Sequence, residues 1–253
     1  AAAGQFAVHA GEQIGHLEAV ARTEKVRRRA TCTPSTTAYA LLLGHLQGGA
    51  GDDDLQGGSG DDTIAGGAGS DTLDGGTHIT GDTLDYSAVG TAIDGGTLDG
   101  GIDTVTQGAD TDTISGFETL FMTAQDDSIN VDIGGTGFTT IDGHGGTDTM
   151  SVIDSTLGVE GSTFASLFNN VEELDFTGTD LVGADTFDIG NDDIDGITSA
   201  SGGNMTIFVN IGTIALTDIN VLAQSGAIIT NDSTIGSTRT VDWDNGSQLV
   251  VQG

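Results

Sequence analysis

The chain has 253 residues, of which 42 are Gly and 1 is Pro, and its 38 acidic against 6 basic side chains give a net charge of −32. This excess of carboxylates argues against nucleic-acid binding, which needs clustered Lys and Arg, and against attraction to anionic lipid. Acidic side chains that repel one another in a compact chain are instead expected to bind cations.

Residues 1–45 differ in composition from the rest of the chain. Five of the six basic residues lie between Arg22 and Arg29, and Arg239 is the only basic side chain after residue 30. Apolar residues at helical spacing predict a helix from about Glu12 to Arg28, so we expect residues 1–45 to form a helical cap.

Two features of this N-terminal part limit the class of protein. Cys32 is the only cysteine, which excludes an intrachain disulfide. The longest apolar stretch, Ala38 to Leu43, is far shorter than the roughly 18 residues that span a bilayer. We therefore expect no membrane insertion and, if the protein is exported, a pathway without a cleaved N-terminal signal.

A nine-residue pattern repeats in register from residue 48 to residue 87. Its form is G-G-x-G-x-D-x-U-x, where U is apolar, and its first three copies begin at Gly48, Gly57 and Gly66. A fourth copy begins at Gly75 and resumes at Gly81 after a two-residue insertion. Three tandem copies in one register exceed what a Gly- and Asp-rich composition produces by chance.

Residues 48–87 resemble the RTX (repeats-in-toxin) calcium-binding nonapeptides of secreted bacterial proteins. The resemblance implies an all-β fold, a parallel β-roll or β-solenoid in which each nonapeptide forms half a coil. The G-G-x-G-x-D part would form a turn, for which glycine is suited because it adopts positive φ without strain. The x-U-x part would form a short strand with U inside, which predicts a narrow core of Leu55, Ile64, Leu73 and Leu84.

Metal binding is expected because residues 46–87, the predicted calcium-binding roll, cannot neutralise their own charge. Residues 48–87 hold nine Asp and no Lys or Arg. Carboxylates mixed with backbone carbonyls suit Ca²⁺, which takes roughly six to eight oxygen ligands, better than Mg²⁺, which prefers tight octahedral sites with retained water. A glycine-rich acidic linker without metal is the alternative.

Turns two repeats apart should share one edge of the coil. This predicts one ion between Asp53 and Asp71 and another between Asp62 and Asp82. Turn residues complete the predicted ligand set, namely Gly48, Ala50, Gly51, Gly57, Ser59, Gly60, Gly66, Ala68, Gly69, Gly75 and Gly76.

Over residues 88–195 the repeat decays, and we expect a β-solenoid with wider rungs. Half-units of the form Gly-x-Asp-Thr-apolar recur at Gly101–Val105, Gly146–Met150 and Gly183–Phe187. They make Asp103 and Asp148 candidate metal ligands, with a purely structural role as the alternative.

Two further features extend the pattern. In the nearly complete unit that begins at Gly143, His144 stands in place of the second glycine. Gly116–Leu120 is echoed by Asn170–Leu174, 54 residues later. Both predict that the chain continues to coil.

Residues 196–253 are predicted to be β-rich and to serve as a cap, an assembly surface or an export signal. Strand-forming residues separated by Gly, Asn and Asp indicate strands at Met205–Val209, Thr213–Leu216, Ala227–Thr230 and Gln248–Val251.

No catalytic motif stands out, because the chain has no G-x-S-x-G, P-loop or complete H-E-x-x-H. We therefore expect a calcium-binding structural protein of the bacterial cell surface and not an enzyme. Its acidic roll would fold on Ca²⁺ after secretion, and the chain would self-associate as a surface-layer, filament or adhesin subunit. The alternative is the calcium-binding C-terminal export and folding module of a secreted protease, lipase or epimerase.

Overall fold

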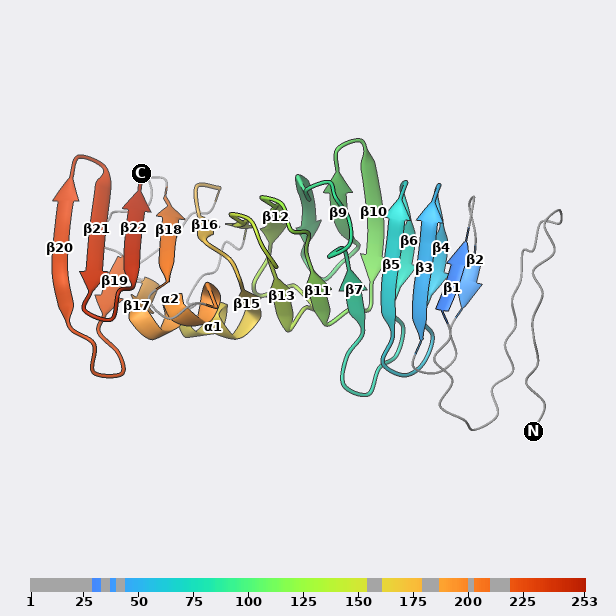
Figure 1. Ribbon diagram of the computed structural model, residues 1–253, viewed down its shortest axis with the longest axis horizontal. Helices are drawn as coiled ribbons and strands as arrows, with labels where there is room; N and C mark the ends of the chain where they lie inside the picture. The colour runs from blue at the N-terminus through green and yellow to red at the C-terminus, as the bar shows by residue number, and fades with distance from the viewer. Residues whose placement is uncertain are drawn as a thin grey trace.

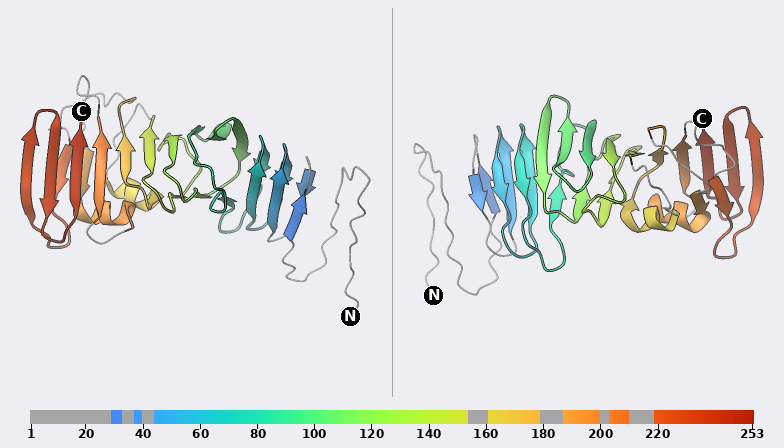
Figure 2. Two further views of the ribbon diagram at one scale, coloured as in Figure 1. Left: turned by 45° about the horizontal axis from the view of Figure 1, so that its top comes forward. Right: turned by 180° about the vertical axis from the view of Figure 1, so that it is seen from behind.

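The structure is a computed structural model that describes residues 29–32, 37–39, 44–153, 161–178, 187–199, 203–209 and 219–253. The described part is elongated, and its strands lie side by side across the long axis (Figure 1). Two further views agree on this arrangement (Figure 2). The helix predicted over Glu12–Arg28 and the half-unit around Asp185 fall outside the described residues.

Two sheets form the two sides of a coil. Sheet A is parallel throughout, and its strands in spatial order are β1 (Arg29–Cys32), β3 (His45–Ala50), β5 (Thr63–Ala68), β7 (Thr83–Asp85), β11 (Thr119–Phe121), β13 (Thr140–Asp142) and β15 (Phe168–Asn169). Sheet B follows the order β2 (Thr37–Tyr39), β4 (Asp54–Gln56), β6 (Thr72–Asp74), β10 (Asp110–Ser115), β9 (Asp103–Gln107), β8 (Gly95–Leu98), β12 (Ser128–Val131), β14 (Thr149–Val152), β16 (Glu173–Asp175), β18 (Asn204–Phe208), β22 (Gln248–Gln252), β21 (Thr238–Trp243) and β20 (Ile229–Ile235).

The core is a double column of inward-pointing residues. Leu55 pairs in register with Leu73 on sheet B, and Ile64 pairs with Leu84 on sheet A. Each of these four side chains is at most 1% exposed. The columns continue beyond the repeats through Leu120, Ile141 and Phe168 on sheet A and through Met150, Leu174 and Ile207 on sheet B. The predicted all-β roll with a narrow core is therefore confirmed.

Among the described residues, the winding is first interrupted after β7. The chain passes ahead to β8, which pairs with β12, and then returns through antiparallel β9 to β10, which lies beside β6 with Ile114 opposite Leu73. Gly100 and Gly108 have φ of 75° and 65° in the two connecting turns, a conformation that hairpin turns favour. The half-unit Gly101–Val105 was predicted as a turn of the coil and instead belongs to this hairpin.

Two seven-residue helices lie along one side of the coil (Figure 1): α1 (Gly161–Leu167) and α2 (Asn191–Ile197). They were not predicted within the β-solenoid of residues 88–195. Phe164 and Leu167 are three residues apart, as are Ile194 and Ile197, and all four side chains are buried, because this spacing gives a short helix one apolar face. Within the described part of the chain, neither helix has the length or the apolar composition needed to cross a membrane.

The C-terminal end extends sheet B. The predicted strands Met205–Val209 and Gln248–Val251 appear as β18 and β22, and Ala227–Thr230 overlaps β20, whereas Thr213–Leu216 lies outside the described residues. Strands β20, β21 and β22 form an antiparallel meander, and Arg239 on β21 pairs with Asp232 on β20 at 2.8 Å. A separate parallel pair consists of β17 (Phe187–Gly190) and β19 (Ile219–Leu222).

Candidate metal centre

The turns of the four repeats share one backbone conformation. Their second glycines have φ between 92° and 115°; these are Gly49, Gly58, Gly67 and Gly76. Side-chain-bearing residues rarely adopt positive φ, although His is among the types enriched there. His144 has a φ of 73°, which agrees with its interpretation as the second residue of a degenerate turn.

Acidic side chains of successive turns form hydrogen-bonded ladders. In the first ladder the backbone N–H of Asp53 donates to Asp71 Oδ1 at 2.8 Å, and the N–H of Asp71 donates to Asp112 Oδ1 at 2.8 Å. The structure thus brings Asp53 and Asp71 together, two repeats apart, as the period predicts. Asp112 supplies the next rung from β10.

The second ladder lies on the opposite edge of the coil. The N–H of Gly44 donates to Asp62 Oδ1 at 2.5 Å, and the N–H of Asp62 donates to Asp82 Oδ1 at 2.7 Å. The N–H of Asp82 in turn donates to Glu118 Oε2 at 2.8 Å. Asp62 and Asp82 are therefore neighbours, as predicted, and Glu118 ends the ladder.

A third ladder follows the same rule in the region of decayed repeats. The N–H of Ile93 donates to Asp127 Oδ1 at 2.7 Å, and the N–H of Asp127 donates to Asp148 Oδ1 at 2.9 Å. The N–H of Asp148 donates to Glu172 Oε2 at 3.1 Å. The echo noticed in the sequence is thus structural, because Glu118 and Glu172 occupy equivalent ends of two ladders.

Asp103, although predicted as a candidate ligand, does not belong to a ladder. Its Oδ1 accepts the N–H groups of Asp99 and Gly100 within the β8–β9 turn, at 2.8 and 2.9 Å. The Gly-x-Asp pattern does not identify Asp112 and Asp127, because neither has a glycine two positions before it. Every acidic ladder residue stands two positions before a buried apolar one, but Asp103 also stands two positions before buried Val105, so this spacing alone does not identify a ladder residue.

The second carboxylate oxygen of several ladder residues is buried without a hydrogen-bond partner among the described residues. These oxygens are the Oδ2 atoms of Asp62, Asp71, Asp82 and Asp148. A buried polar atom without a partner costs about 1–3 kcal/mol, and more when it is charged. Such an arrangement is expected where an ion supplies the missing interaction.

Other ladder residues have their second oxygen satisfied by the protein. The hydroxyl of Tyr86 donates to Asp112 Oδ2 at 2.6 Å. Asp127 accepts the hydroxyl of Thr123 on Oδ1 at 2.7 Å and its N–H on Oδ2 at 2.8 Å. The ladders therefore contain two kinds of rung, and Asp112 and Asp127 are of the kind that needs no ion.

Glycines beside the unpartnered oxygens of Asp62 and Asp148 also lie against a backbone carbonyl of a neighbouring turn. A β-carbon at Gly57 would lie 2.8 Å from Asp62 Oδ2 and would collide with the carbonyl of the first glycine of the next turn on that edge. A β-carbon at Gly143 would likewise collide with Asp148 Oδ2 and with the carbonyl of Asn170. Each position thus offers a carboxylate oxygen and a carbonyl oxygen in a space that excludes any side chain.

The predicted turn ligands lie where stacked turns meet. Gly51 donates its N–H to the carbonyl of Ala68 at 2.7 Å, and Gly60 donates to the carbonyl of Thr77 at 2.8 Å. A carbonyl oxygen has two lone pairs, so these bonds leave one acceptor position on each. The remaining predicted ligands belong to the same stacked turns, namely Gly48, Ala50, Gly57, Ser59, Gly66, Gly69, Gly75 and Gly76.

Burial makes the ladder carboxylates hard to ionise. Removal from water raises the pKa of Asp62 and that of Asp71 to about 6, and repulsion from neighbouring carboxylates adds to the shift. The same causes raise the pKa of Asp148 to about 8. A bound cation would reverse this effect, because it stabilises the charged form.

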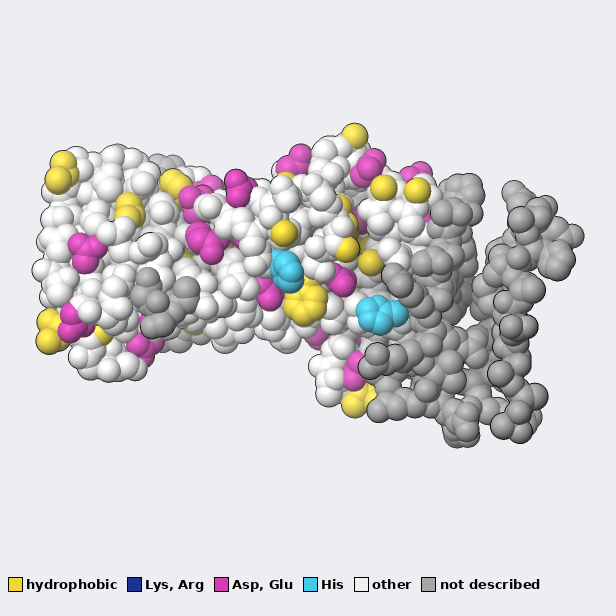
Figure 3. Space-filling view, viewed as in Figure 1, with side chains coloured by type: hydrophobic (Ala, Val, Ile, Leu, Met, Phe, Trp, Pro, Cys, Tyr) yellow, Lys and Arg dark blue, Asp and Glu magenta, His cyan; other side chains and the backbone are white. Residues whose placement is uncertain are grey.

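Little positive charge is present to balance these groups. On the face shown in Figure 3, acidic side chains recur along the described part, and no Lys or Arg side chain of the described residues is visible. Oxygen-only sites of carboxylates and carbonyls suit a hard divalent ion, and Ca²⁺ in particular.

Comparisons with known proteins agree with this chemistry. Residues 47–77 match the family model described as RTX calcium-binding nonapeptide repeat (4 copies). No curated protein matches the chain. Among solved structures, the extracellular lipase LipA from Serratia marcescens is similar with a TM-score of 0.31 and 12% identity, over 90% of this chain and 40% of the lipase. The chain thus spans less than half of that lipase.

Proposed function

We propose, on the premise that residues 47–77 are RTX calcium-binding repeats, that this chain is a secreted structural protein whose coil folds when Ca²⁺ binds. RTX repeats bind calcium and occur in secreted bacterial proteins. The observation that supports calcium-dependent folding most directly is the set of buried, unpartnered Oδ2 atoms in the ladders. The proposal places the protein at the cell surface and assigns it no catalytic role.

The ladder residues explain why folding should require the ion. Stacked turns place Asp62 next to Asp82, and Asp71 between Asp53 and Asp112, so the folded coil holds carboxylates that repel one another. Ca²⁺ supplies the positive charge that these carboxylates and the turn carbonyls would share. Extracellular modules bind Ca²⁺ with dissociation constants of roughly 10⁻⁴ to 10⁻³ M, so the chain would fold outside the cell and not in the cytosol.

The C-terminal end of the coil supports self-association. Strand β20 is the last strand of sheet B and is hydrogen-bonded to β21. Its residues are almost all exposed, and Ile235 at its end is 82% exposed. An exposed edge strand is a template for pairing with another strand. We therefore propose that the opposite end of sheet B in a second copy of this chain pairs at this edge, because only such head-to-tail pairing repeats into a surface layer or filament.

One experiment tests both parts of the proposal. The full chain is titrated with Ca²⁺ from a chelated solution while far-ultraviolet circular dichroism records strand content and light scattering records mass. We expect β-type dichroism to appear at millimolar or lower Ca²⁺, to be weaker with Mg²⁺, and to be followed by an increase in mass. Full β-type dichroism in chelator at about pH 9, where the ladder carboxylates are ionised, would contradict calcium-dependent folding. A folded chain that stays monomeric would contradict self-association and favour a module of a larger secreted enzyme.

A further inference from the structure

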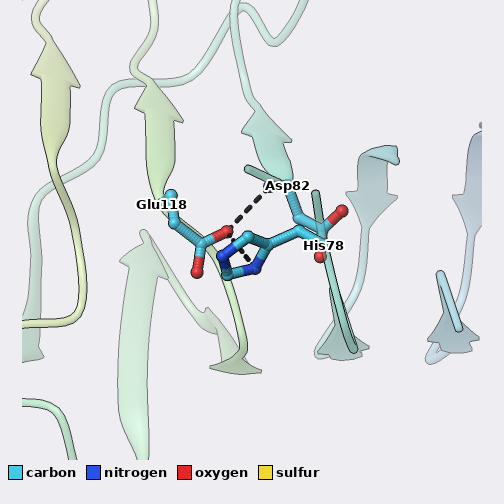
Figure 4. A group of neighbouring side chains, drawn as sticks. All are labelled: His78, Asp82 and Glu118. Atoms are coloured by element: carbon cyan, nitrogen blue, oxygen red, sulfur yellow. Dashed lines mark hydrogen bonds and ion pairs between the residues drawn. The ribbon is translucent and has the colours of Figure 1, made fainter. Parts of the chain in front are cut away.

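A side-chain cluster that the repeat pattern does not predict lies at the end of the second ladder. The turn between β6 and β7 contains the two-residue insertion and extends beyond the neighbouring turns (Figure 1). Its His78 lies against Glu118, with Nδ1 3.0 Å from Oε2. The same Oε2 accepts the N–H of Asp82 at 2.8 Å (Figure 4). The imidazole of His78 and the backbone of Asp82 thus both contact the carboxylate of Glu118.

The spacing of these residues fits a metal ion. His78, Asp82 and Glu118 each offer one ligand atom, and the three atoms lie within 4.8 Å of one another. Ligands of a tetrahedral Zn²⁺ with bonds of about 2.1 Å lie about 3.4 Å apart, so small side-chain rotations bring all three to one ion. In the view of Figure 4 the imidazole lies between the two carboxylates.

A second observation points to a ligand. Asp82 is completely buried, and its Oδ2 has no hydrogen-bond partner among the described residues. This oxygen therefore needs a cation or a donor, and because Asp82 also pairs with Asp62 it would be shared between the cluster and the predicted Ca²⁺ site. The side chain of His78 is 37% exposed, so solvent can deliver an ion to the cluster and occupy its remaining coordination position.

We propose that His78, Asp82 and Glu118 bind a first-row divalent transition metal ion, with Zn²⁺ as the probe, at a site that adjoins the predicted Ca²⁺ site between Asp62 and Asp82 and shares Asp82 with it. An imidazole nitrogen with two carboxylates suits Zn²⁺, whereas Ca²⁺ prefers oxygen ligands alone. The residues belong to two segments separated by the β8–β9–β10 excursion. The ion would therefore link the repeats to the later coil, and binding to the folded chain alone would stabilise it.

The third ladder supplies an internal comparison. It also ends in a glutamate, Glu172, and its turn also contains a histidine, His144, which is exposed. Among the described residues, however, only His78, Asp82 and Glu118 form a group of three such ligands within 4.8 Å of one another. A histidine near a ladder end is thus not sufficient, and His144 provides a matched control.

The test is a calorimetric titration of Zn²⁺ into the full chain, folded in saturating Ca²⁺ and freed of other metals. Three variants are compared with the unchanged chain: His78→Asn, Glu118→Gln and His144→Asn. We expect one Zn²⁺ equivalent to be lost or to bind at least tenfold more weakly in the first two, and no change in the third. Asn is used because it tolerates the positive φ of residue 144. Imidazole resonances that shift with Zn²⁺ and disappear in His78→Asn would locate the ion.

Two results would overturn the inference: no Zn²⁺ binding by the unchanged chain, or the same isotherm for His78→Asn. Circular dichroism of the same samples confirms that each variant is folded, and His78 is exposed enough that its replacement should leave the fold intact. The calcium titration is recorded separately. A normal Ca²⁺ response without a Zn²⁺ site overturns this inference alone, and Zn²⁺ binding by a coil that needs no Ca²⁺ overturns the proposed function alone.

Discussion

The roll of residues 44–87 and the coil of residues 119–176 stack in the same way but build their turns differently. In the roll each turn carries glycines and lies in backbone contact with the next turn on its edge. In the later coil only the turn that begins at Gly143 keeps most of this pattern, and α1 replaces the turn before β15. Both regions nevertheless keep an acidic ladder and an apolar column. Each rung thus combines an acidic residue with the apolar residue two positions after it, a spacing that is necessary but not sufficient because Asp103 has it without forming a rung.

The ladders also differ in how the second oxygen is satisfied. At Asp112 and Asp127 the protein supplies a hydroxyl or an N–H. At Asp62, Asp71 and similar rungs the oxygen has no hydrogen-bond partner among the described residues. The first kind should be indifferent to Ca²⁺ and the second should depend on it. The following substitutions test that distinction.

The largest effect is expected from Gly57→Ala. Its β-carbon would collide with a backbone carbonyl and with Asp62 Oδ2, where the ion is expected. We expect a loss of about 3 kcal/mol in unfolding free energy, measured by urea denaturation in saturating Ca²⁺. Gly145→Ala is the matched control, because a β-carbon there meets no atom within 4 Å. Equal losses in the two variants would show that turn contact does not explain the glycine pattern.

Next in size is the contrast between Asp71→Asn and Asp112→Asn. Asp71 has an unpartnered oxygen, whereas Asp112 accepts the hydroxyl of Tyr86. We expect Asp71→Asn to raise the Ca²⁺ midpoint about tenfold, equivalent to about 1.4 kcal/mol, and Asp112→Asn to leave it within about twofold. Adding Asp53→Asn to Asp71→Asn should raise the midpoint further. An unchanged titration in the double variant would contradict the pairing of these two residues around an ion.

A pH-dependent effect is expected without calcium. Burial raises the pKa of Asp148 to about 8 and that of Asp62 to about 6, from 3.8. A carboxyl with a raised pKa binds its proton more tightly in the folded chain. Protonation therefore stabilises the fold fully below about pH 3.8, and this stabilisation is lost as the pH rises through about 6 and then about 8.

In chelator, β-type dichroism should consequently fall as the pH is raised from about 5 to about 9. Asp148→Asn resembles the protonated side chain and should remove the part of the change near pH 8. Saturating Ca²⁺ should remove the pH dependence of the dichroism in the unchanged chain. If the dichroism of Asp148→Asn changes with pH as it does in the unchanged chain, Asp148 is not one of the groups whose ionisation destabilises the fold.

The smallest effect is expected from Tyr86→Phe. Phe fills the same buried space but lacks the hydroxyl that donates to Asp112 Oδ2. We expect a loss of about 1 kcal/mol in unfolding free energy, because Asp112 keeps its other oxygen bonded to the N–H of Asp71. Thr123→Val should behave similarly at Asp127. Unchanged stability in both variants would mean that these rungs do not need a protein donor.

The sequence predicts the regular part of the molecule well because period and register are local properties. Four apolar residues at the eighth position define the inner column, and Asp53 and Asp71 meet as an 18-residue coil requires. His144 is also identified correctly, since a turn position that needs positive φ can be located by counting from neighbouring glycines.

The remaining features depend on contacts between distant segments. The repeat pattern does not predict that β10 pairs with β6, because this pairing depends on the fold of the antiparallel strands β8, β9 and β10 as a whole. Asp103 was chosen for its local pattern and caps a turn, whereas Asp112 lacks the pattern and forms a rung. Glu118 and Glu172 were noticed as an echo, but only the fold shows that each accepts the N–H of the preceding ladder residue.

The excursion after β7 has a consequence for the route by which the chain acquires its fold. A solenoid wound strictly in chain order would add each strand to the one just completed. Here β6 lacks its second hydrogen-bonding partner until β10 has folded beside it, and β8 lacks its parallel partner until β12 has folded. Folding that adds strands one by one from β1 should therefore slow after β7. We expect the strands before β8 and those after β10 to nucleate separately, and to join when the β8–β9–β10 segment packs between them.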